Sequence, residues 1–241
     1  MQKVTDVRTA VEGLYQAFSI YLRPEYTDPC LHCHSLDDDL KLRSSPLRDL
    51  SVSDLEDYAQ DALLVWGSVN HFRYFLPRIF ELYFHQSGPR FAYLDPEILF
   101  SKFRHGHWLD WPAEEQTAVR ELLHAIWAKI LDYPPASLSL TDLQSWICSI
   151  AQAEDDLNPY LRAWISDQRL SASLALASLL LSQSGRNPFW DGREAQYAQL
   201  QSWLESKTVV EKLQRALQLA ESHSDKSQFE AALRTIGASR S

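Results

Sequence analysis

The chain has 241 residues, of which 45% are hydrophobic and 23% are charged, and its formal net charge is −9. This length is enough to bury a sizeable core, and the apolar content excludes an intrinsically disordered chain. The acidic excess argues against a nucleic-acid partner, because phosphate groups would be repelled and the sequence contains no run of Lys and Arg.

Cysteine usage and hydropathy bear on the compartment. Two of the three Cys are clustered, which fits a reducing compartment better than a disulfide framework. The N-terminal stretch is amphipathic and carries acidic residues, unlike a signal peptide. The longest apolar run, Leu174 to Leu181, contains Ser178 and is too short to cross a membrane. We therefore expect a cytoplasmic protein with no membrane partner.

The first predicted helix runs from Thr5 to about Tyr21, where apolar residues recur at three- and four-residue steps, and Pro24 ends it. Residues 23–50 are the least regular part of the chain, with one short turn of helix around Leu36 to Leu42. Only seven Gly are present, which favours helices over tight β-turns throughout the sequence.

The stretch from Ser53 to Phe84 predicts two amphipathic helices joined at Gly67. Ser53 is the expected N-cap of the first helix, with Glu56 completing a capping box, and Ser68 is the expected N-cap of the second. A helix pair this apolar cannot stand alone in water, so other helices must cover it.

Further helices follow in the rest of the chain: one from Asp95 to about Phe103, a longer one after Pro112, one capped by Thr141, one after Pro159, and others over 170–181, 193–205, 208–221 and 226–236. No alternating β-branched runs with hairpin turns are present. We predict an all-α fold of about ten helices in antiparallel hairpins, either an irregular HEAT-like stack or a helical bundle, forming a single domain over residues 1–241.

The sharpest local signal is Cys30-Leu31-His32-Cys33-His34. Two thiolates separated by two residues can hold one Zn²⁺, and His34 or His32 could be a third ligand, so Cys30, Cys33 and His34 are our candidate metal ligands. A fourth ligand would have to come from elsewhere, from Cys148, His105, His107 or His124. The alternative is that these are ordinary loop cysteines and solvated histidines.

Two other chemistries fit the same string. It matches the C-x-x-C-H attachment motif of c-type haem, but that attachment requires export to an oxidising compartment, for which we find no signal. It could also be a redox-active thiol pair, although such pairs normally begin a helix after a strand, and we predict no strand.

A second cluster holds His105, His107, Trp108 and Trp111 on a predicted loop. Imidazole titrates near neutral pH and indole offers a flat apolar face, so these side chains could form a site or anchor a protein partner. The alternative is that both Trp side chains are core anchors of a connection between helices, with exposed histidines beside them.

Acidic residues form two runs, Asp37, Asp38 and Asp39, and Glu154, Asp155 and Asp156. Such groups can bind Mg²⁺ or act as acids and bases, but helix starts and solvated turns also favour them. No G-x-S-x-G, phosphate-binding glycine loop or H-E-x-x-H motif is present, and we therefore expect no enzyme activity.

The first third of the chain contains Cys30 with Cys33 and His34, Pro46-Leu47-Arg48-Asp49-Leu50, Tyr58-Ala59, Trp66-Gly67 and Phe72 to Ile79. Together these segments resemble a group of uncharacterised bacterial proteins, some of which accompany secreted polymorphic toxins. The resemblance implies an immunity protein that occupies a toxin domain.

An acidic, helical chain with aromatic-rich loops also suits a protein-binding module. We expect it to neutralise a toxin domain that has a basic surface. The expected interface residues are Asp37, Asp38, Asp39, Glu154, Asp155, Asp156, His105, His107, Trp108 and Trp111. The alternative is a zinc-binding helical enzyme or regulator that uses Cys30, Cys33 and His34; apart from this possible zinc, no cofactor is expected.

Overall fold

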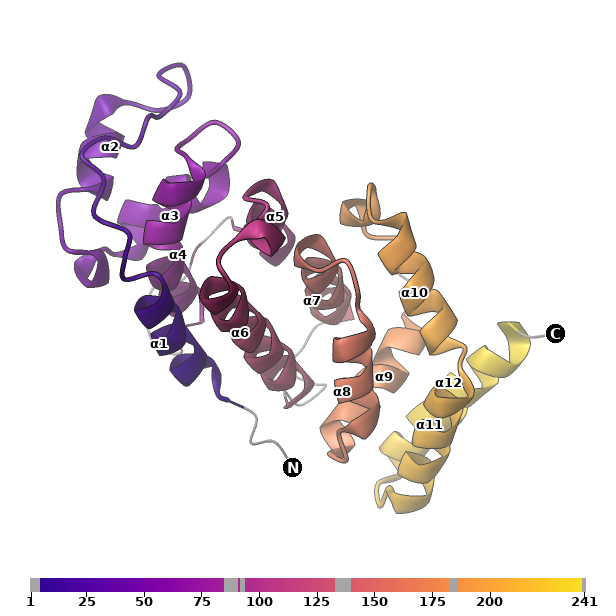
Figure 1. Cartoon of the computed structure of the whole chain (residues 1–241). Helices are drawn as coiled ribbons and strands as arrows, with labels where there is room; N and C mark the ends of the chain where they lie inside the picture. Colours follow the sequence, from indigo (N-terminus) through magenta and orange to yellow (C-terminus); the bar gives the residue numbers. More distant parts are fainter. Residues whose placement is uncertain (1–4, 85–90, 92–93, 133–139, 183–185, 240–241) are drawn as a thin grey trace. The chain divides into compact units, whose positions relative to one another are not determined.

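The computed structural model describes residues 5–84, 91, 94–132, 140–182 and 186–239. These residues form twelve α-helices and three short 3-10 helices, and within them the only strand-like pairing is two isolated bridges at Trp66 (Figure 1). The predicted all-α fold is therefore confirmed. No helix of the described segments has both the length and the apolar character required to cross a membrane.

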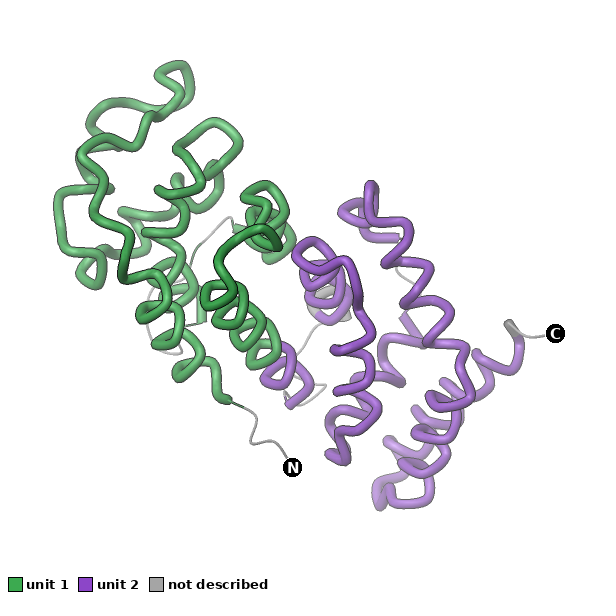
Figure 2. Tube along the Cα trace, in the orientation of Figure 1, with its two compact units in different colours: residues 1–126 green, residues 127–241 purple. Residues whose placement is uncertain are grey.

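The chain divides into two compact units, residues 1–126 and 127–241 (Figure 2). The boundary lies within one long helix, α6, which spans Ala113–Asp132. The single domain predicted for residues 1–241 stays a prediction, because these contacts define two units. The choice between a HEAT-like stack and a bundle also stays a prediction.

Unit 1 is built around α4, whose side chains Phe72, Phe75, Leu76, Ile79 and Phe80 are fully buried. Helix α4 packs against α1 and α3, and α3 also contacts α2 and α5. The helices of unit 1 are α1 (Val7–Ala17), α2 (Leu36–Leu42), η1 (Leu47–Asp49), α3 (Val52–Asp61), α4 (Val69–Tyr83), α5 (Pro96–His105), η2 (Trp108–Asp110) and the first part of α6.

The N-cap of α3 is Ser51, and the predicted cap at Ser53 is wrong. The backbone N–H of Ser51 donates to the Asp54 carboxylate at 2.8 Å, and its hydroxyl donates to the same group at 2.6 Å. This reciprocal capping box uses the aspartate three residues after Ser51 in place of Glu56. By contrast, the predicted N-cap of α4 is confirmed, because the Ser68 hydroxyl accepts the backbone N–H of His71.

Helix α3 ends at Asp61, earlier than the sequence predicts, and residues 62–68 form the connection to α4. Leu63 has a left-handed backbone (φ 64°), and its N–H donates to the Trp66 carbonyl at 3.0 Å. Gly67 also has positive φ (79°), and a Cβ there would lie 3.3 Å from the Thr27 carbonyl oxygen. The connection therefore needs glycine at this position, both for its φ and for the close approach of residue 27.

Unit 2 is centred on α9, the most apolar helix, which packs against α7, α11 and α12. Trp164 lies between Trp127 and Trp203, with ring centroids 5.2 Å from each, and its indole N–H donates to the Ala172 carbonyl at 2.7 Å. The helices of unit 2 are the end of α6, α7 (Leu140–Ala153), α8 (Asn158–Ser166), α9 (Leu170–Leu181), η3 (Pro188–Trp190), α10 (Glu194–Leu204), α11 (Lys207–Leu219) and α12 (His223–Ser239).

Candidate functional site

The Cys30–His34 segment forms a tight turn directly before α2. The Cys30 carbonyl accepts the backbone N–H groups of Cys33 and His34, both at 2.9 Å. The backbone N–H of Cys30 donates to the Val65 carbonyl at 2.9 Å, which joins the turn to the connection between α3 and α4. His34 lies against the Trp66 ring (centroids 4.3 Å apart), and its Nε2 is 2.8 Å from the Asp61 carboxylate.

The two thiols of this turn have different electrostatic environments. The pKa of Cys30 is lowered because its sulfur accepts hydrogen bonds from the backbone N–H groups of His32 and Cys33 and from the Cys33 thiol. The pKa of Cys33 is raised by its hydrogen bond to Cys30 and by the nearby negative charge of Cys30. Cys30 is half-buried, whereas Cys33 is exposed.

The predicted zinc site gains no support from the geometry. Across the segments that the structure describes, no three His, Cys, Asp or Glu side chains are grouped so that they could hold a metal ion. The Nε2 of His34 faces Asp61, and Cys148, one proposed fourth ligand, is buried in unit 2. Metal ligation by Cys30, Cys33 and His34 stays a prediction.

A buried polar network holds the segment before the turn in place. The Asp39 carboxylate is 1% exposed and accepts the backbone N–H of Thr27 at 2.9 Å, its hydroxyl at 2.5 Å, and Nε of Arg43 at 2.7 Å. The Trp66 indole N–H donates to the same Thr27 hydroxyl at 2.8 Å. This network ties residue 27 both to α2 and to the loop that follows α3.

The three predicted interface acids of α2 therefore differ. Asp39 is enclosed in that network and is not available to a partner, which corrects the prediction for this residue. Asp38 completes a capping box with Ser35, whose hydroxyl and backbone N–H lower the pKa of Asp38 to about 2 with help from Lys41. Asp37 is exposed on the first turn of α2.

Exposed apolar side chains surround this turn. We call Leu31, Leu36, Leu40, Leu64 and Val65 the leucine patch; they are between 41% and 62% exposed. Leu36 and Leu40 are four residues apart on α2 and so lie on the same helix face. The Cys30 to Val65 hydrogen bond holds the start of the turn next to residue 65, and α2 contacts α3. Sequence reasoning missed this patch, because an exposed leucine and a core leucine look alike in a periodic pattern.

The aromatic anchors predicted at the second cluster are internal. Trp108 and Trp111 are 1% and 3% exposed, so neither is available to a partner, and the core-anchor alternative is correct. The Trp111 indole N–H donates to the Gly106 carbonyl at 2.7 Å, and the Arg73 guanidinium stacks 4.5 Å from the centre of its ring. His105 and His107 are exposed beside them, as that alternative predicted.

The second acidic run lies in unit 2, between α7 and α8, and its members have internal partners. Glu154 accepts the hydroxyl of Tyr160 at 2.9 Å, and Asp155 pairs with the buried Arg193 at 2.9 Å. The backbone N–H of Asn158 and then the amide of Gln199 lower the pKa of Asp156. These three acidic residues thus form a capped turn between two helices. Their predicted role at an interface stays a prediction.

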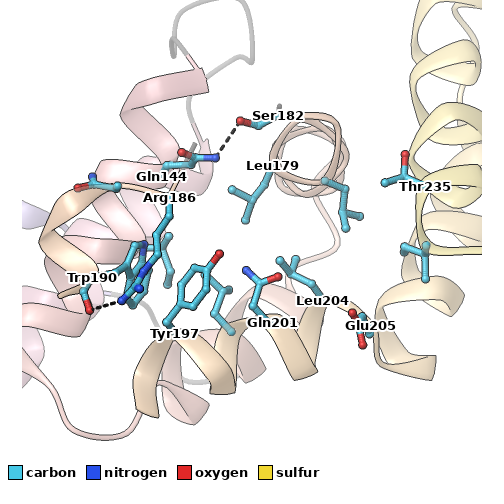
Figure 3. Close-up of a pocket in the computed structure, with 15 residues that line it drawn as sticks. Gln144, Leu179, Ser182, Arg186, Trp190, Tyr197, Gln201, Leu204, Glu205 and Thr235 are labelled. Carbon is cyan, nitrogen blue, oxygen red and sulfur yellow. Dashed lines mark hydrogen bonds between the residues drawn. The ribbon is translucent and has the colours of Figure 1, made fainter. Parts of the chain in front are cut away.

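Unit 2 also contains a cavity of about 300 Å³ that sequence reasoning did not find. In Figure 3 the ring of Tyr197 and the amide of Gln201 point into it, while Arg186 lies beside Tyr197. The guanidinium of Arg186 is 5.1 Å from the centre of that ring and donates to the Trp190 carbonyl at 2.9 Å. Asp191 and Glu194 lie 3.4 and 3.6 Å from the same guanidinium and already balance its charge.

Comparisons of the chain with protein-family models, with curated proteins and with solved structures found no match. The resemblance to toxin-associated proteins therefore stays a prediction.

Proposed function

We propose that this protein is a protein-binding module that binds a basic protein through the leucine patch, and most concretely that it is an immunity protein that neutralises a cognate toxin domain. The observation that carries the proposal is the position of the patch in the most acidic part of the chain. Residues 25–65 contain ten acidic and three basic residues, which is a formal charge of −7 out of −9 for the whole chain.

The apolar part of this surface favours contact with another macromolecule. Single exposed leucines are normal on a protein surface, but contiguous apolar residues with a polar rim are typical of interaction sites. Here the apolar residues lie on a scaffold that is fixed by the Asp39 network and by the Cys30 to Val65 hydrogen bond. A preorganised patch loses little conformational entropy on binding, so more of its burial contributes to affinity.

The charged part of the surface favours a basic partner. Exposed Asp28 and Asp37 flank the turn, and Asp57 is exposed on α3. Complementary charges raise the association rate and disfavour acidic competitors, whereas the apolar contacts contribute most of the lifetime of the complex. The resemblance to bacterial proteins suggests a toxin domain as the partner. The acidic residues favour a toxin domain with a basic surface.

The test uses the polypeptide encoded by the reading frame adjacent to this one. We expect direct binding of the purified proteins, and we expect co-expression of this chain to restore growth to cells that produce the neighbouring polypeptide. Leu36→Asp and Leu64→Asp should each weaken binding by roughly thirty-fold, equivalent to about 2 kcal/mol for a central contact.

The matched control is Leu219→Asp, which places the same charge at a leucine that is 72% exposed at the end of α11 in unit 2. This variant should bind as tightly as the unmodified protein. The proposal is wrong if the neighbouring polypeptide does not bind, or if all three variants bind with equal affinity.

A further inference from the structure

We propose that Cys30 and Cys33 form a reversible dithiol–disulfide site that exchanges with low-molecular-weight disulfides. The inference goes beyond the proposed function and does not depend on it, because it requires only the geometry of the turn and the access of solvent to its two cysteines.

The turn brings the two cysteines to a separation that a disulfide can span. Both the Cys33 and the His34 N–H groups donate to the Cys30 carbonyl at 2.9 Å, so residues 30–33 form a closed turn. The first and fourth Cα atoms of such a turn lie within roughly 7 Å of each other. Disulfides join Cα atoms that are about 4.4–6.8 Å apart, so closing the bond requires little backbone movement.

The reduced turn is held in this arrangement from both ends. At its start the Cys30 N–H donates to the Val65 carbonyl at 2.9 Å, and at its end His34 pairs with Asp61 at 2.8 Å and packs against Trp66. The two sulfur atoms therefore have a high effective concentration with respect to each other.

Access distinguishes this pair from the third cysteine of the chain. Cys33 is exposed and Cys30 is half-buried, whereas Cys148 is fully buried within α7. A small disulfide in solution can reach the turn without unfolding the protein, but it cannot reach Cys148. Disulfide exchange is thus confined to Cys30 and Cys33, and Cys148 serves as an unreactive control in the same protein.

The exchange balances in two steps. The Cys30 sulfur, as the thiolate, attacks one sulfur of the small disulfide; a bond forms between them, and the other half of the reagent leaves as a thiolate. The Cys33 sulfur, after losing its proton to solvent, then attacks the Cys30 sulfur and releases the second half as a thiolate. The protein loses two electrons and two protons as Cys30 and Cys33 become a disulfide, and the reagent gains the electrons to become two thiols.

We choose Cys30 as the attacking sulfur because the nearby backbone N–H groups of His32 and Cys33 favour its thiolate and lower its pKa. Cys33 is then the resolving residue. Its position in the same turn, three residues further on, makes resolution intramolecular and fast compared with attack by a second reagent molecule.

The experiment treats the intact native protein with increasing ratios of oxidised to reduced glutathione, traps the free thiols with an alkylating reagent, and identifies the products by mass spectrometry. We expect the peptide containing Cys30 and Cys33 to lose two hydrogens without gaining a glutathione, and dithiothreitol to reverse the change. Cys148 should be alkylated only after denaturation.

Two variants assign the roles. Cys33→Ser should accumulate glutathione on Cys30, because the resolving sulfur is missing, and Cys30→Ser should react at least tenfold more slowly. The proposal is overturned if the unmodified protein accumulates a mixed disulfide, if neither cysteine reacts at ratios that oxidise a free dithiol, or if Cys148 reacts as readily as the pair.

Discussion

Three consecutive aspartates at the start of α2 should respond to alanine substitution in three different ways. In Asp39→Ala, the buried N–H of Thr27 loses its acceptor, and so do the Thr27 hydroxyl and the Arg43 guanidinium. In Asp38→Ala, the Ser35 capping box and an exposed pair with Lys41 are lost. In Asp37→Ala, an exposed carboxylate is removed from the first helical turn.

The expected losses follow from the burial of each group. Thr27 is fully buried, so its unpaired N–H costs about 1–3 kcal/mol, and loss of the charge-assisted bonds brings the total for Asp39→Ala to about 3 kcal/mol. A helix cap contributes about 1 kcal/mol, which is the expected loss for Asp38→Ala. The helix dipole favours the exposed Asp37 by about 0.3–1 kcal/mol.

Urea unfolding of the three variants, followed by circular dichroism, measures these free energies of unfolding directly. Equal losses at all three positions, or the largest loss at Asp37, would refute the description of α2 as a helix fixed through Asp39. Lowering the pH provides a second check. Because the pKa of Asp38 falls from 3.8 to about 2 on folding, its contribution is complete above pH 4 and disappears as the pH falls toward 2.

Two further substitutions test buried groups of unit 1. Burial lowers the pKa of Lys102 from 10.5 to about 8, although its ammonium donates to the Gln60 carbonyl at 2.5 Å. Between pH 8 and pH 10.5 the unfolded chain therefore holds a proton on Lys102 that the folded chain has released. The free energy of unfolding should rise with pH over this range in the unmodified protein, and it should rise less in Lys102→Met. Parallel pH profiles of the two proteins would contradict this. Trp111→Phe should cost about 2 kcal/mol of stability, because the Gly106 carbonyl loses its donor, while partner affinity stays unchanged. A large loss of affinity in a folded Trp111→Phe protein would show that this ring contacts the partner after all.

Much of the fold could be predicted because helical periodicity is a local property. The bounds of α9 match the predicted 170–181, and Ser68 caps α4 as expected. The predicted helix bounds were wrong where tertiary contacts determine the end of a helix. Periodicity continues through Trp66, but Leu63 adopts a left-handed conformation and the Trp66 indole donates to Thr27, so α3 ends at Asp61.

The candidate site was less predictable, because the sequence identifies reactive residue types without showing their exposure. Trp108 and Asp39 have residue types that suit an interface, yet both are buried. Leu63 lies on the apolar side of the predicted helix, yet it is only half-buried because the helix has already ended. No local pattern distinguishes these outcomes, since burial is set by residues distant in the chain.

Hydrogen exchange of the complex with the neighbouring polypeptide locates the bound surface without substitutions. We predict that the partner slows exchange of backbone amides at residues 30–40 and 62–67, around the leucine patch, and leaves those of α11 and α12 unchanged. Protection confined to residues 127–241, or unchanged exchange around Leu31 and Leu64 in a saturated complex, would show that the leucine patch is not the binding surface.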